Sequence, residues 1–139
     1  DAPGRGRLRL IGDIWSSFRA LPGWVQLWLV LVLVPVNCAS LIWFGVAGGS
    51  AVAILAVGGI LPNAILLLRE RGFSRAMAFS HLALWPILVV VLLIWLRNGG
   101  SEVPRGYLWT LLVVNVTSLG FDLRDGWFWI NGDRAVAGQ

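Results

Sequence analysis

Residues 76–96 read AMAFSHLALWPILVVVLLIWL, a stretch of 21 residues in which His81 is the single ionisable side chain. A helix needs about 20 apolar residues to cross the hydrocarbon core of a bilayer, because each residue adds about 1.5 Å. The stretch therefore predicts a transmembrane helix. The fold class depends on how often this pattern recurs along the chain.

Three more segments have the same character: residues 21–44, 50–68 and 107–126. The last is free of charge only as far as Phe121, and its helix has to continue through Asp122 to reach a bilayer-spanning length. The connections between segments hold ten residues or fewer, so neighbouring helices are expected to be antiparallel. The sequence predicts a single all-α membrane domain over residues 1–139, a polytopic four-transmembrane-helix up-down bundle.

The composition supports lipid as the main solvent of the chain. Of its 139 residues 58% are hydrophobic and 13% are charged, which leaves too few charges to cover a soluble domain. The net charge is +4, and all eleven basic residues are arginines at the ends of apolar segments. That distribution indicates contact with lipid headgroups and argues against nucleic acid as a partner. The preference for Arg, Gly, Ala and Val indicates a bacterial protein.

Arginine also predicts the orientation, because cytoplasmic connections are enriched in basic residues. The N-terminal arm, the second connection and the C-terminal part together hold nine arginines, whereas the first connection has none and the third has two. We therefore expect both termini on the cytoplasmic side of the cell (inner) membrane.

Two flanking segments have an interfacial character. In residues 8–20, Leu8, Ile11 and Trp15 recur at helical spacing opposite polar side chains, which predicts an amphipathic helix on the inner leaflet. The alternative is a helix that docks on a partner. Residues 127–139 are expected to form a cytoplasmic tail. Aromatic and charged side chains mix where the fourth segment meets this tail, as in a membrane anchor or a docking surface.

Polar residues inside the apolar segments form a candidate intramembrane site, because such residues are costly in lipid. Asn63 and His81 each lie five residues from the inner end of their segments, about 7–8 Å deep, and Asp122 falls at a similar depth. A buried carboxylate needs a partner, so we expect Asp122 to hydrogen-bond His81 or Asn63. Asn115 and Ser118 share the helix face of Asp122.

The sequence contains no nucleophile–base pair, metal-ligand cluster, phosphate loop or redox motif. We therefore expect no enzymatic activity, no catalytic residue, no cofactor and no metal site. The expected role is that of an accessory or assembly subunit of a larger membrane complex, or of a homo-oligomer, acting through helix contacts in the lipid bilayer. One alternative is an oligomeric channel or transporter with its polar site near Asn63, His81 and Asp122. Another is a cofactor-carrying subunit with His81 as its one axial ligand.

Overall fold

The computed structural model describes residues 3–138, which are mostly helical, with no strand among them. Four helical stretches are long and apolar enough to cross a membrane: Gly23–Trp43, Gly49–Glu70, Arg75–Asn98 and Arg105–Ile130. The predicted all-α class with four candidate spans is thereby confirmed. The parts of the predicted domain and tail that fall on residues 1, 2 and 139 lie outside the described residues.

The first candidate span is not one uniform helix. It consists of α2 (Gly23–Leu27), the π-helical η1 (Trp28–Leu33), α3 (Val34–Cys38) and the 3₁₀-helical η2 (Ala39–Trp43). Pro35 lacks a backbone N–H and interrupts the regular hydrogen-bond ladder. The wider turn before it and the tighter turn after it change the helical pitch. The helix predicted over residues 21–44 is thus a succession of short helical pieces from Gly23 to Trp43.

The other helical elements are α1 (Pro3–Ala20), α4 (Gly49–Glu70), η3 (Arg75–Met77), α5 (Ala78–Asn98) and α6 (Arg105–Ile130). Helix α6 begins directly after Pro104, a residue suited to helix starts, and ends before Gly132, whose φ of +102° no helix accepts. Residues 127–130 are therefore helical, and the tail predicted from residue 127 begins only at Asn131.

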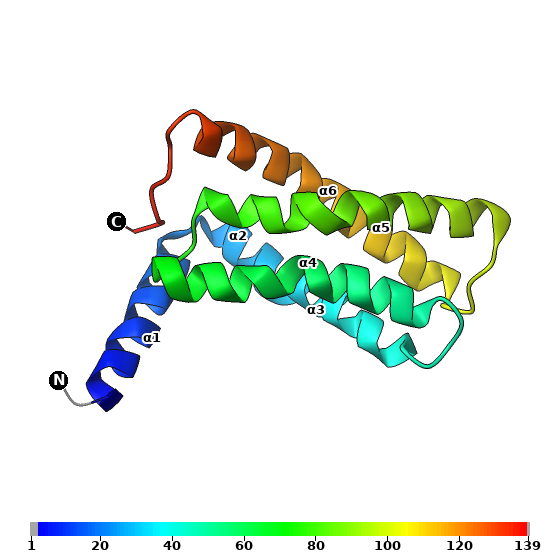
Figure 1. Cartoon of the computed structure of the whole chain (residues 1–139), viewed down its shortest axis with the longest axis horizontal. Helices are drawn as coiled ribbons and strands as arrows, with labels where there is room; N and C mark the ends of the chain where they lie inside the picture. The colour runs from blue at the N-terminus through cyan, green and yellow to red at the C-terminus, as the bar shows by residue number, and fades with distance from the viewer. Residues whose placement is uncertain (1–2, 139) are drawn as a thin grey trace.

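The four candidate spans pack side by side around one core. Helix α5 packs against α4 and α6, while the pieces of the first span contact both α4 and α6. The connections that follow η2 and α5 lie at one end of the molecule, and both chain termini lie at the other, where α1 leaves the bundle at an angle (Figure 1). The centre of the core is formed by fully buried Trp85, Leu88, Leu92 and Leu111.

Close packing of α4 against α5 depends on small residues. Gly49, Ala53 and Ala56 share one helix face and are buried. Gly59 continues this face, and a Cβ atom there would overlap the indole ring of Trp85. The Trp85 Nε1–H donates to the carbonyl oxygen of Ala56 at 3.2 Å, so the largest core side chain is satisfied by the backbone of the neighbouring helix.

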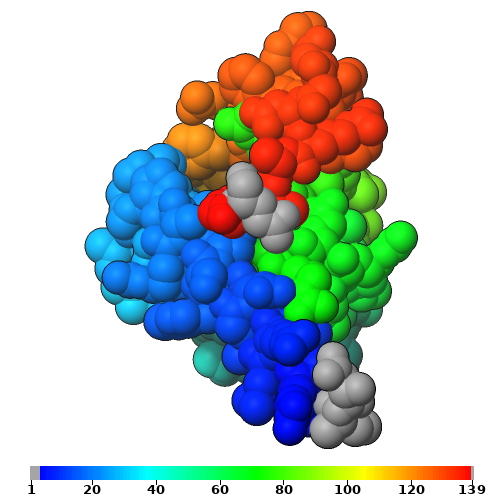
Figure 2. Space-filling view, turned by 90° about the vertical axis from the view of Figure 1, so that its left-hand side faces the viewer, coloured from blue at the N-terminus to red at the C-terminus, as the bar shows by residue number. Residues whose placement is uncertain are grey.

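Segments from three parts of the chain meet at the end that carries the termini (Figure 2). The loop after α4 is held from one side by α1, because the Phe73 N–H donates to Ser17 Oγ at 2.9 Å and Arg71 pairs with Asp13 at 2.6 Å. From the other side, the Ala137 N–H donates to the Phe73 carbonyl at 2.8 Å. We call residues 71–74 the clamped loop. These contacts fix the angle at which α1 leaves the bundle.

Candidate functional site

Three of the predicted polar residues form a continuous hydrogen-bonded row across α4, α5 and α6. The Asn63 amide nitrogen lies 3.0 Å from Nε2 of His81, and Nδ1 of His81 lies 2.9 Å from Oδ2 of Asp122. His81 and Asp122 are buried, and Asn63 is partly buried. The expected hydrogen bond between Asp122 and His81 is present, and Asn63 bonds to the other ring nitrogen rather than to Asp122.

The direction of these bonds follows from the donors. An amide nitrogen can only donate, so Nε2 of His81 accepts from Asn63. In a neutral imidazole the other nitrogen then carries the hydrogen, and Nδ1–H donates to the carboxylate of Asp122. Asp122 thus holds His81 in one tautomer and one ring orientation.

The row also contains an unused acceptor. The amide oxygen of Asn63 is buried and has no hydrogen-bond partner among the described residues. A half-turn of the Asn63 amide would bring this oxygen, in place of the amide nitrogen, next to Nε2 of His81.

Trp85 covers one face of the histidine. The two rings are parallel within 3° and their centroids lie 3.9 Å apart, with the residues one helical turn apart on α5. Both ring nitrogens of His81 are already hydrogen-bonded. An axial ligand of a cofactor needs a free ring nitrogen, so this geometry does not favour the cofactor-carrying alternative.

A second polar pair lies between the first span and α6. Nδ2 of Asn37 donates to Oδ1 of Asn115 at 2.8 Å, and Nδ2 of Asn115 donates back to Oδ1 of Asn37 at 2.9 Å. Both side chains are fully buried. Asn37 was not among the residues of the predicted site. Counting residues from the outer end of its segment would have placed it at a depth similar to that of Asn115, but would not have given the helix rotation that pairs them.

The remaining predicted residue does not join either pair. Ser118 is buried on the same face of α6 as Asn115 and Asp122, as expected, but makes no side-chain hydrogen bond to them in the described residues. The candidate site is therefore two separate polar contacts in an apolar core. One lies toward the end with the termini and the other toward the middle of the bundle.

Charged residues near the termini are linked to each other outside these pairs. Arg75 pairs with Asp133 and with Asp125, the latter at 3.4 Å, and its guanidinium lies 4.6 Å from the Phe128 ring centroid. Trp129 packs edge-on against Phe79, and the centroids of the two rings lie 5.2 Å apart. These contacts bind one side of the last turns of α6 to the start of α5.

Comparison with known proteins finds no matching family model, no similar curated protein and no similar solved structure. The geometry of the chain alone therefore has to indicate its function.

The asparagine pair predicts a measurable coupling. Asn37→Ala and Asn115→Ala should each lower the free energy of unfolding in mixed micelles by about 1–2 kcal/mol, because each leaves a buried amide without its partner. The double variant should lose less than the sum, with a coupling of about 0.5–1.5 kcal/mol. Thr117→Ala is the control, since this exposed hydroxyl bonds only to its own helix. Strictly additive losses would contradict the pairing.

The row through His81 predicts a graded response at Asp122. Asp122→Leu should lower the free energy of unfolding by about 1–3 kcal/mol, because the Nδ1–H of His81 loses its acceptor in the core. Asp122→Asn keeps an oxygen at that position and should lose clearly less. Thermal unfolding of the detergent-solubilised protein measures both variants. A leucine variant as stable as the parent protein would show that the contact does not stabilise the bundle.

Proposed function

We propose that this chain is a non-enzymatic, multi-pass protein of the bacterial inner membrane whose four spans cross in up-down order with both termini cytoplasmic. The distribution of polar and apolar side chains between the interior and the surface of the bundle supports this proposal. The asparagine pair and the Asn63–His81–Asp122 row lie within the bundle, while large apolar side chains such as Leu31, Ile54 and Val113 are exposed on the candidate spans. This is the pattern that lipid requires of a helix bundle.

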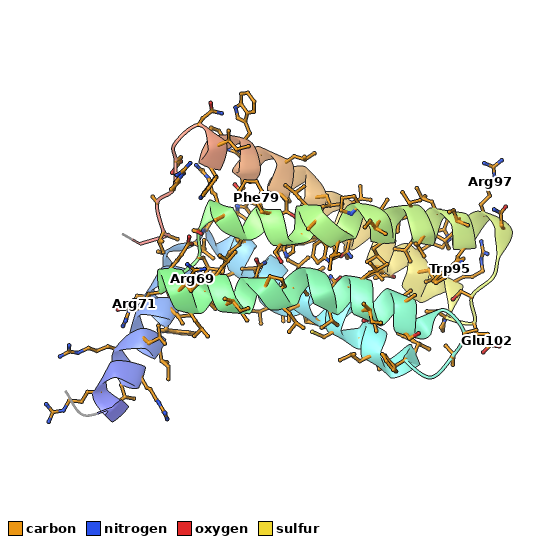
Figure 3. The ribbon with its side chains drawn as sticks, viewed as in Figure 1. Arg69, Arg71, Phe79, Trp95, Arg97 and Glu102 are labelled. Carbon is orange, nitrogen blue, oxygen red and sulfur yellow. The ribbon has the colours of Figure 1, made fainter. Side chains whose placement is uncertain are left out.

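The charges at the two ends agree with this orientation. Arg69 and Arg71 lie at the end that carries the termini, and Arg97 and Glu102 lie at the opposite end (Figure 3). The end with the termini also carries α1 and its arginines, so the positive-inside rule favours that end as the cytoplasmic one.

The role we propose is that of an accessory or assembly subunit, and one surface carries this proposal. Leu123, Trp127 and Ile130 are 64%, 67% and 65% exposed and recur at i, i+4 and i+7 on α6. We call these three residues the α6 end stripe. Helix α6 has 26 residues, about 39 Å of length against a hydrocarbon core of about 30 Å. The stripe therefore continues to the edge of the bilayer, where another membrane helix can cover it.

The rest of this helix end is already occupied. Phe128 and Trp129 face Arg75 and Phe79, and the clustered ion pairs hold that side in place. A rigid helix end with one unoccupied apolar side suits packing against a helix of a larger membrane protein. A second copy of this chain is the other partner that the same surface would accept.

Paired substitutions in the stripe test the role. The tagged full-length protein is crosslinked in its native membrane and purified together with any bound partner. The double variant Trp127→Ser with Ile130→Ser should no longer co-purify the partner, because most of the contact area is removed. Ile42→Ser is the control, since Ile42 is 75% exposed at the opposite end. The mass of the crosslinked species distinguishes self-association from a different protein. A parent protein that runs as a monomer without partner would contradict the proposal.

A second candidate role rests on the row through His81. A buried histidine bonded to a carboxylate and to a reorienting amide is suited to proton transfer in an oligomeric transporter or channel. In proteoliposomes with an internal pH dye, this role predicts a proton flux that Asp122→Asn reduces at least tenfold and Asp125→Asn leaves unchanged. Proteoliposomes of the parent protein with no flux above protein-free vesicles would exclude it.

A further inference from the structure

An apolar groove lies where α1 leaves the bundle. Its volume is about 520 Å³, within the range of small-molecule sites. One wall is formed by α1 and the other by the first candidate span, and the lining residues include Ile11, Trp15, Phe18, Leu29, Val30 and Val34. None of the described residues that line the groove is charged.

Hydrogen bonds and an ion pair next to the groove hold α1 in place against the bundle. Asp13 and Ser17 of α1 are bound to Arg71 and Phe73 of the clamped loop. At the turn between α1 and α2, the Gln26 amide nitrogen donates to the carbonyls of Arg19 and Leu21. Because these bonds fix the angle between α1 and the span, the groove exists before anything fills it, which lowers the entropic cost of binding.

The shape and depth of the groove match a lipid tail. Leu29 and Val34 lie six and eleven residues beyond Gly23, about 9 and 16 Å along the span. The groove therefore runs from the level of α1 toward the midplane of the bilayer, since half of a hydrocarbon core of about 30 Å is about 15 Å. Ile11 and Trp15 are 63% and 61% exposed and face this space without a protein side chain covering them.

A positive charge lies on α1 one helical turn from a residue that lines the groove. Arg7 is exposed and lies four residues before Ile11, so it sits one turn further along α1 on the same helix face. An arginine at the interface binds a phosphate through paired N–H donors. Arg71, by contrast, is engaged with Asp13. The apolar groove and Arg7 together form the complement of a phospholipid with a negative headgroup.

We propose that the groove binds one acyl chain of an anionic phospholipid whose phosphate is held by Arg7. The proposal rests on the membrane location proposed above, but not on the role of the α6 end stripe. Helix α1 then acts as a clamp on a single lipid, in addition to lying on the surface of the leaflet.

Native mass spectrometry of the detergent-solubilised protein, titrated separately with phosphatidylglycerol and phosphatidylcholine of equal chain length, tests the site. The parent protein should bind one phosphatidylglycerol more tightly than phosphatidylcholine, by about fivefold for one arginine. Val30→Trp should weaken both lipids at least tenfold by filling the groove. Arg7→Gln should remove the preference and leave phosphatidylcholine binding unchanged.

Val113→Trp is the matched control, because Val113 is 60% exposed on α6 and lines neither wall of the groove. Val30 is itself 56% exposed, so a tryptophan there does not enter the core, and an unchanged helical circular dichroism spectrum checks the fold. Equal lipid binding in Val30→Trp and the parent protein would overturn the proposal, as would an equal loss in Val113→Trp. The lipid binding measured here does not depend on whether the double variant Trp127→Ser with Ile130→Ser loses a co-purified partner.

Discussion

Pairing of polar side chains inside an apolar core is the constraint on which this structure depends. A medium without water offers no alternative partner, so each buried amide, imidazole or carboxylate must find one on another helix. Asn37 finds Asn115, and His81 finds both Asn63 and Asp122. The two contacts tie the first span to α6, and α5 to both α4 and α6. Apolar packing alone would leave the rotation of these helices weakly specified, whereas directed hydrogen bonds define it.

Small residues make these bonds geometrically accessible. The α4 and α5 backbones approach closely because Gly59 has no side chain where the Trp85 indole lies. Trp85 in turn bonds to the backbone of α4 and stacks on His81. The Trp85 indole, which fills the space between α4 and α5, is thus also the ring that packs against His81. Packing and polar pairing therefore support each other at the same level of the bundle.

Much of this architecture was predictable from the sequence, and the failures have physical causes. Length and hydropathy predicted the four candidate spans, and counting residues from the inner ends placed Asn63, His81 and Asp122 at one depth. Counting cannot give helix rotation, so the choice between His81 and Asn63 as the partner of Asp122 stayed open until the contacts were seen. The irregular pitch around Pro35 was not predicted, because a proline signals an interruption without saying whether neighbouring turns widen or tighten. The continuation of α6 to Ile130 was missed because the prediction ended this helix at residue 126, where its length already sufficed to cross a bilayer.

The clamped loop has a consequence for how the protein is made. The Phe73 carbonyl accepts a hydrogen bond from the Ala137 N–H, and the loop borders Val136, so this contact comes from residues that follow α6 in the chain. The contacts from α1 to the loop involve residues synthesised long before. During synthesis the loop can therefore be held from one side only, and its second contact has to wait until α6 has been placed.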